Sequence, residues 1–112
     1  MRLEQEELPG NILNLKLIGS LDIAGAGEIE MPFSVIAGKN TRVILDLSKV
    51  TFLASIGIRV LVKTARAISS RGGRFVIYDP TFDARKVLRS TGIDAVIPVV
   101  SNQAAAIAEC SK

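Results

Sequence analysis

Apolar and polar residues alternate near the start of the chain in the manner of a β-strand. Leucine occupies every second position from Leu13 to Leu17, and the residues between them are polar. A period of two is typical of a strand with one buried face. Because Pro9-Gly10 is a turn-forming pair, the pattern predicts a hairpin made of residues 1–8 and 11–18.

The next segment has apolar residues at helical spacing, but residues that disfavour helices interrupt it. Gly25, Gly27 and Pro32 all fall between residues 19 and 40. Inside a helix, glycine costs about 1 kcal/mol relative to alanine and proline costs about 3 kcal/mol. We therefore expect a short or irregular helix that begins near Met31 or Pro32.

The rest of the chain alternates short apolar runs with amphipathic helices. The run Val43-Ile44-Leu45 is typical of a strand covered on both faces. The clearest helical pattern ends before Gly72-Gly73, a common helix stop, and leaves Ile56 and Val60 opposite its main apolar face. The expected elements are strands over 42–46, 74–78 and 95–100, helices over 56–70, 83–90 and 103–110, and a loop over 47–54.

This order of elements defines a fold class. Strands that alternate with helices predict an α/β protein whose crossovers are right-handed and whose sheet is mostly parallel. We expect one domain over residues 1–112, with a mixed, mostly parallel sheet of about five strands, about four helices and the first strand at an edge.

Composition removes several classes of function. The chain has no histidine and one cysteine, Cys110. Histidine is the usual general base and the commonest metal ligand, so a Ser-His-Asp hydrolase is excluded and a zinc site is disfavoured. We predict that the protein is not an enzyme and holds no cofactor or metal. A single cysteine forms no internal disulfide, which fits a reducing cytoplasm.

Charge and hydropathy argue against nucleic acid and membrane. The 14 basic and 11 acidic residues give a net charge of +3, and the two signs are interspersed. A nucleic-acid-binding protein would gather its basic residues on one face. No apolar stretch approaches the about 20 residues that span a bilayer. We expect neither direct nucleic-acid binding nor membrane insertion, and a monomer or weak homodimer.

The predicted loop before the clearest helix holds the main candidate residue, Ser55. Its position predicts an N-cap whose hydroxyl accepts a hydrogen bond from the amide of Gly57 or Ile58. A helix N-terminus also favours a phosphoryl group, so Ser55 is a candidate phosphorylation site. Asp22 and Asp46 fall at predicted strand ends, where turn and capping roles are expected before acid–base chemistry.

Three segments resemble the STAS domain family, which includes bacterial anti-sigma-factor antagonists and sulfate-transporter tails. Leu17-Ile18-Gly19-Ser20-Leu21-Asp22 resembles the family's Leu-x-Gly-x-Leu-Asp signature. Phe52-Leu53-Ala54-Ser55-Ile56-Gly57-Ile58 is similar to its Phe-x-Asp-Ser-Ser-Gly-Leu loop, and Leu88-Arg89-Ser90-Thr91-Gly92-Ile93 to the short helix before its last strand. Order and spacing agree over nearly the whole chain.

The resemblance implies a function and a partner. In antagonists of this family, an anti-sigma factor that is also a serine kinase phosphorylates the first serine of Asp-Ser-Ser-Gly, which corresponds to Ser55. Phosphate would block docking and a phosphatase would restore it. The resemblance, the loop positions and the charges together predict a partner-binding set of Gly19, Asp22, Ala54, Ser55, Ile56, Gly57, Arg59, Thr81 and Phe82.

Two departures from the family pattern keep alternatives open. Ala54 replaces the aspartate before the phosphorylated serine, and Ile56 replaces the second serine. These changes make the site more apolar and favour a constitutive contact surface. The alternatives are a STAS accessory subunit of an ABC lipid-transport complex without phosphorylation, and a small-ligand-binding domain.

Overall fold

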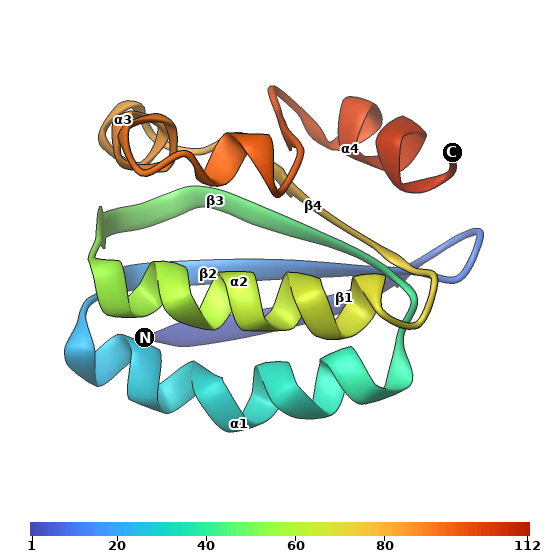
Figure 1. Cartoon of the computed structure of the whole chain (residues 1–112), viewed down its shortest axis with the longest axis horizontal. Helices are drawn as coiled ribbons and strands as arrows, with labels where there is room; N and C mark the ends of the chain where they lie inside the picture. The colour runs from blue at the N-terminus through green and yellow to red at the C-terminus, as the bar shows by residue number, and fades with distance from the viewer.

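A mixed sheet of five strands forms the centre of the computed structural model, which describes residues 1–112 (Figure 1). The strands follow the order β1-β2-β3-β4-β5 across the sheet, so β1 is an edge strand. Only the β1–β2 pair is antiparallel. The prediction of a mixed, mostly parallel α/β sheet is therefore confirmed. The strands are β1 Arg2–Leu8, β2 Ile12–Leu21, β3 Arg42–Leu53, β4 Arg74–Tyr78 and β5 Val99–Val100.

Four α-helices and one short 3-10 helix connect the strands. Helices α1 and α2 lie side by side against one face of the sheet, and α3 and α4 lie beyond β3 and β4 on the far side from α1 (Figure 1). None of the helices is long and apolar enough to cross a membrane. The helices are α1 Ile23–Lys39, α2 Ser55–Ser69, α3 Phe82–Ser90 and α4 Gln103–Cys110, and the 3-10 helix is Ile93–Ala95.

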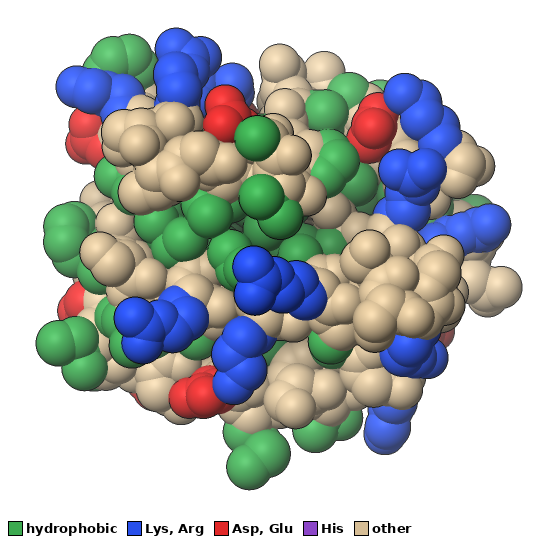
Figure 2. Space-filling model, in the orientation of Figure 1, with side chains coloured by type: hydrophobic (Ala, Val, Ile, Leu, Met, Phe, Trp, Pro, Cys, Tyr) green, Lys and Arg blue, Asp and Glu red, His purple; other side chains and the backbone are tan.

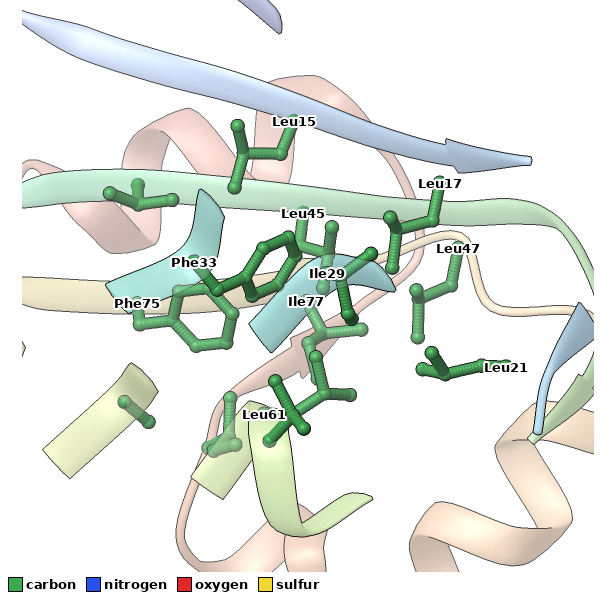
Figure 3. Packing of buried hydrophobic residues seen from close by; sticks show 14 of the residues in the cluster. Leu15, Leu17, Leu21, Ile29, Phe33, Leu45, Leu47, Leu61, Phe75 and Ile77 are labelled. Atoms are coloured by element: carbon green, nitrogen blue, oxygen red, sulfur yellow. The ribbon is translucent and has the colours of Figure 1, made fainter. Parts of the chain in front are cut away.

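The strands bury apolar side chains on both faces because helices pack on each. The larger core includes Phe33 of α1 and Leu61 of α2, packed among Leu45 and Ile77 of the sheet (Figure 3). A smaller core on the opposite face joins strand residues to α4, and it consists of Ile12, Ile44, Val76, Tyr78, Ala106 and Cys110. Coverage on both faces explains the unbroken apolar runs of β3 and β4.

Helix α1 is longer than the sequence pattern predicted. It spans 17 residues from Ile23 to Lys39 and includes Pro32, whereas we expected a helix that begins near Met31 or Pro32. Burial of Ile29 and Phe33, among other residues of this helix, removes enough apolar surface from water to outweigh the about 3 kcal/mol cost of the proline. The helix therefore continues through Pro32.

Strand β3 also extends beyond its predicted end. Residues 47–53 belong to the strand, so the expected loop over 47–54 is wrong except for its last residue. Strand β2 runs parallel to this extension as far as the Leu21–Leu53 pair, with two shifts of register on the way. Hydrogen bonding to β2 thus keeps these residues extended, although polar positions 48, 49 and 51 suggested a loop.

The last strand is shorter than predicted. We expected residues 95–100, but β5 comprises only Val99–Val100, and Ile93–Ala95 form the 3-10 helix. Pro98 precedes the strand and has no backbone N–H to donate, which restricts pairing with β4 to the final residues. The helix over Gln103–Cys110 is as predicted, and Asn102 caps it.

Candidate functional site

Three helices begin at the same edge of the sheet, the one formed by the C-terminal ends of β2, β3 and β4. Ile23 is the first residue of α1, Ser55 of α2 and Phe82 of α3. Strands β2, β3 and β4 run in parallel, so the segments that follow them emerge together, at the left of Figure 1. This edge contains most of the predicted site residues, as expected for loops at strand C-termini.

Asp22 caps α1. Its Oδ1 accepts a hydrogen bond of 2.8 Å from the backbone N–H of Gly25, which confirms the predicted capping role. This bond holds the pKa of the Asp22 carboxyl below its ordinary value of 3.8 because it stabilises the charged form. Asp22 is thus a carboxylate at neutral pH, positioned by the end of β2.

Ser55 is the first residue of α2, and it is not the N-cap that the sequence predicted. Ala54 occupies the cap position with extended dihedral angles (φ −91°, ψ 162°), and no side chain caps the helix. The Ala54 amide donates to Leu21 O at 3.0 Å, and its carbonyl accepts from Ile58 at 3.1 Å. This bond to β2 moves the helix start one residue earlier than predicted and leaves Ser55 exposed.

The N-terminus of α2 has neither a side-chain cap nor a negative charge to balance its dipole. Its first turn contains no acidic residue, and no side-chain oxygen accepts from its amides. Uncapped first-turn amides and the helix dipole together favour a negative group at this position. A phosphoryl group on Ser55 is thus compatible with the local backbone.

Gly57 permits α2 to approach the end of β2. A Cβ atom at position 57 would lie 2.5 Å from Leu21 Cγ and 3.1 Å from Leu21 O. Glycine is therefore required by the close approach of the two elements. Gly57 thereby fixes how far Ser55 projects from the sheet.

Thr81 and Phe82 lie beside the extension of β3. The Thr81 hydroxyl donates to Val50 O at 3.3 Å and accepts from the Ala84 amide at 3.2 Å, so Thr81 caps α3. Asp83 lies in the first turn of α3. Phe82 is 75% exposed, and the Lys86 Nζ lies 5.3 Å from its ring centre.

Sequence reasoning missed two exposed apolar residues at this edge. Ile23 is 80% exposed and Phe52 is 55% exposed. The position of Ile23 directly after the capping Asp22 could have indicated that it lies at the exposed start of a helix. Phe52 was missed because it was assigned to the wrongly predicted loop. We call Ile23, Phe52, Ser55 and Phe82, with Asp22, Arg59 and Lys86 around them, the Ser55 surface.

Other predicted site residues contribute mainly to packing or to the backbone conformation of the fold. Ile56 is half-buried and packs against the larger core. Gly19 has a φ of +119° at a register shift of β2, a conformation that favours glycine. Partner contact by these two residues, and by Gly57 and Thr81, stays a prediction. Val60, whose partner was unassigned, is buried and belongs to the larger core.

Asp46 does not join this site. It lies inside β3, not at a strand end as predicted, and its Oδ1 accepts from the Ser48 amide at 2.8 Å. Seven residue steps of strand separate it from Leu53, which corresponds to about 23 Å. Asp22 and Asp46 therefore do not converge as an acid–base pair. No group of three or more His, Cys, Asp or Glu side chains is arranged to hold a metal ion.

Comparison with known proteins assigns the chain to a family. The sequence pattern of the family described as "STAS domain" matches residues 4–106, and the chain belongs to this family. It is 27% identical over 109 residues to the protein named "Putative anti-sigma factor antagonist BtrV" of Bordetella bronchiseptica, which covers 96% of this chain and 93% of that protein.

Solved structures share the fold. An anti-sigma factor antagonist from Mycobacterium paratuberculosis superposes with a TM-score of 0.87 at 22% identity, covering 99% of this chain and 94% of that one. The Bacillus cell fate determinant SpoIIAA, solved in a phosphorylated form, superposes with a TM-score of 0.74 at 21% identity, covering 96% of this chain and 98% of that one. The predicted STAS-type fold is thus confirmed.

Two glycine substitutions test the close approach at Gly57. Gly57→Ala should lower the free energy of unfolding by about 1–3 kcal/mol, because the added methyl group overlaps Leu21. Gly27→Ala is the matched control: a methyl group added at this position of α1 would meet no atom within 4 Å, so alanine should stabilise by about 0.5–1 kcal/mol. Urea denaturation measures both, and equal effects would contradict the packing argument.

The Asp22 cap predicts a pH dependence of stability. A carboxyl with a lowered pKa stabilises the fold above its unfolded pKa, and this stabilisation is lost as pH falls through the folded value. Wild type should therefore exceed Asp22→Asn in unfolding free energy at pH 7, and the difference should shrink below pH 3.8. Urea denaturation over this range measures the difference, and a constant gap would contradict the role of the charge.

Proposed function

We propose that this protein is an anti-sigma-factor antagonist that acts in the cytoplasm and binds, through its Ser55 surface, an anti-sigma factor with serine kinase activity. One observation carries the proposal. The sheet edge at which α2 begins holds three large exposed apolar residues, Ile23, Phe52 and Phe82, and α2 begins there with exposed Ser55 and no side-chain cap. Membership of the STAS family and the relative from Bordetella support it.

The exposed apolar side chains supply the expected docking energy. Each is large, and burial of such side chains in an interface typically contributes more than the polar contacts around them. Lys86 lies over the Phe82 ring, exposed Arg59 follows Ser55 by four residues on α2, and Figure 2 shows further Lys and Arg side chains in the upper left, where α3 lies. The expected partner surface is therefore an apolar hollow with acidic residues at its rim.

Phosphorylation of Ser55 would switch this docking off. A phosphoserine carries a charge of about −1.5 to −2 at neutral pH and would stand among the apolar contacts. Its desolvation in an apolar interface opposes binding, whereas the free amides of α2 stabilise it in the unbound protein. Removal of the phosphate by a phosphatase would restore docking.

A second candidate function is constitutive docking without phosphorylation, as in an accessory subunit of an ABC lipid-transport complex. Ala54 and Ile56 favour it, because the acidic and hydroxyl side chains that the family has at these positions are absent. Ile56 also packs against the core, so the helix start gains an apolar anchor in place of a polar recognition group. The two candidates differ in one observable, the phosphorylation of Ser55.

Docking through the Ser55 surface is tested with paired apolar-to-polar substitutions. Phe82→Ser should weaken binding to the anti-sigma factor by about tenfold or more, because it removes an exposed aromatic anchor. Met31→Ser is the matched control, since Met31 is also 73% exposed but lies in the middle of α1. Titration calorimetry measures both affinities, and equal losses would place the interface elsewhere.

Phosphorylation is tested by incubation with anti-sigma kinases of the same genome and ATP. The wild type should gain the mass of one phosphoryl group and then bind its partner more weakly, and Ser55→Ala should gain none. Ala54→Asp restores the family's carboxylate and should speed the reaction if kinase recognition depends on it.

The outcomes separate the two candidate functions. Binding that persists without any mass change, in wild type and in Ala54→Asp, would overturn the switch and support constitutive docking. Absence of binding to every anti-sigma factor, together with capture of an ABC subunit that Phe82→Ser abolishes, would support the accessory-subunit function.

A further inference from the structure

A second polar hollow lies at the opposite end of the sheet from Ser55. It has a volume of about 670 Å³ and lies where β3 and β4 begin and α4 ends. Its ionisable lining residues are Arg42, Arg74, Lys112 and Cys110, and no Asp or Glu lines it. Burial raises the pKa of the Cys110 thiol, so this group adds no negative charge at neutral pH. At the right of Figure 2, where Figure 1 places this end, several Lys and Arg side chains and little Asp or Glu are visible.

Two of these cations stand side by side without an acidic partner. Arg42 and Arg74 are register partners on the parallel strands β3 and β4, which are about 4.8 Å apart. Ile44 and Val76, two residues further along, both pack toward α4, so the arginines emerge on that same face. Neither arginine forms a salt bridge. Like charges directly opposite on neighbouring strands destabilise a sheet.

The surrounding protein offsets only part of this charge. Lys112 is already paired with Glu109 at 2.9 Å. The C-terminal ends of α4 and of α2, whose last residue Ser69 lines the hollow, each contribute about half a negative charge through their dipoles. The two full positive charges on Arg42 and Arg74 exceed these contributions, so the lining side chains and helix ends together leave the hollow positive.

The donors of the hollow are partly positioned in advance. The Arg42 Nη1 donates to Gly10 O at 2.9 Å, which orients its guanidinium group and leaves other N–H groups free. The hydroxyls of Thr41 and Ser69, also in the lining, donate to no protein atom. Gly72, also in the lining, has open space at the position of a Cβ, so no side chain of this residue covers the hollow.

We propose that this hollow binds a phosphate group, held between Arg42 and Arg74 with Thr41 and Ser69 as further donors. A phosphate carries up to two negative charges and presents several acceptor oxygens. These match the charges and paired N–H donors of two guanidinium groups and the O–H donors of two hydroxyls. A carboxylate has one charge and two oxygens and would leave donors unused. The hollow lies across the sheet from the Ser55 surface, so the site is independent of the proposed docking function.

The test titrates the full chain with phosphate-bearing probes and follows backbone amide shifts by NMR. Inorganic phosphate, pyrophosphate and AMP are the three arms, at constant ionic strength and with acetate as the carboxylate comparison. Saturable shifts should centre on Ser69, Gly72 and Gly73. A stronger response to AMP or to pyrophosphate than to inorganic phosphate would identify a nucleotide or a polyphosphate as the source of the phosphate group.

Charge-matched variants decide whether the arginines form the site. Arg42→Gln and Arg74→Gln should each weaken pyrophosphate binding by about tenfold, the loss expected for a charge-assisted hydrogen bond. Arg89→Gln removes the same charge from the exposed side of α3, near the other end of the sheet, and should leave binding unchanged. Thermal unfolding by circular dichroism confirms that each variant is folded.

Several results would overturn the proposal. They are the absence of saturable shifts, equal weakening in Arg89→Gln, and shifts centred on the uncapped amides of Ser55 to Gly57. Binding of acetate as tight as that of phosphate would likewise overturn the assignment to phosphate. Loss of partner docking in the experiments on Phe82 would leave this site unaffected, so the two proposals fail separately.

Discussion

The parallel pairing of β2 with β3 is the interaction on which the rest of the structure depends. It extends from Leu13–Val43 to Leu21–Leu53, and the Ala54 amide continues it by donating to Leu21 O. Because both strands end together, Asp22, which caps α1, and Ser55, the first residue of α2, emerge at the same place. Gly57 makes this arrangement sterically possible. A shorter pairing would leave residues 47–54 as a loop and Ser55 without a fixed position.

The two ends of the sheet differ in chemistry for a topological reason. Helices α1, α2 and α3 begin at one end, which also holds exposed Ile23, Phe52 and Phe82 and the uncapped start of α2. The other end holds the starts of β3 and β4, with Arg42 and Arg74 in register. A small domain can thus present an apolar surface suited to a protein partner and a cationic hollow suited to an anion, separated by the length of the strands.

The environment of Ser55 combines features that favour opposite functions. An exposed hydroxyl at an uncapped helix start tolerates a phosphate, whereas Ala54 and the core-packed Ile56 remove polar groups that a kinase could recognise. The exposed apolar residues serve either function, since both require docking. The geometry therefore supports the docking surface more directly than it supports the switch.

The sequence by itself determined the strand and helix order, the mixed α/β sheet, the Asp22 cap and the family, because these follow from periodicity, capping residues and local motifs. It could not determine the length of α1, since burial of residues such as Phe33 against the sheet outweighs Pro32. It assigned the N-cap of α2 to Ser55, whereas Ala54 is the N-cap. The start of this helix is set by a hydrogen bond from Ala54 to a strand that is distant in the sequence. The grouping of Ile23, Phe52 and Phe82 also required the tertiary structure, since residues this far apart in the chain meet only when parallel strands end together.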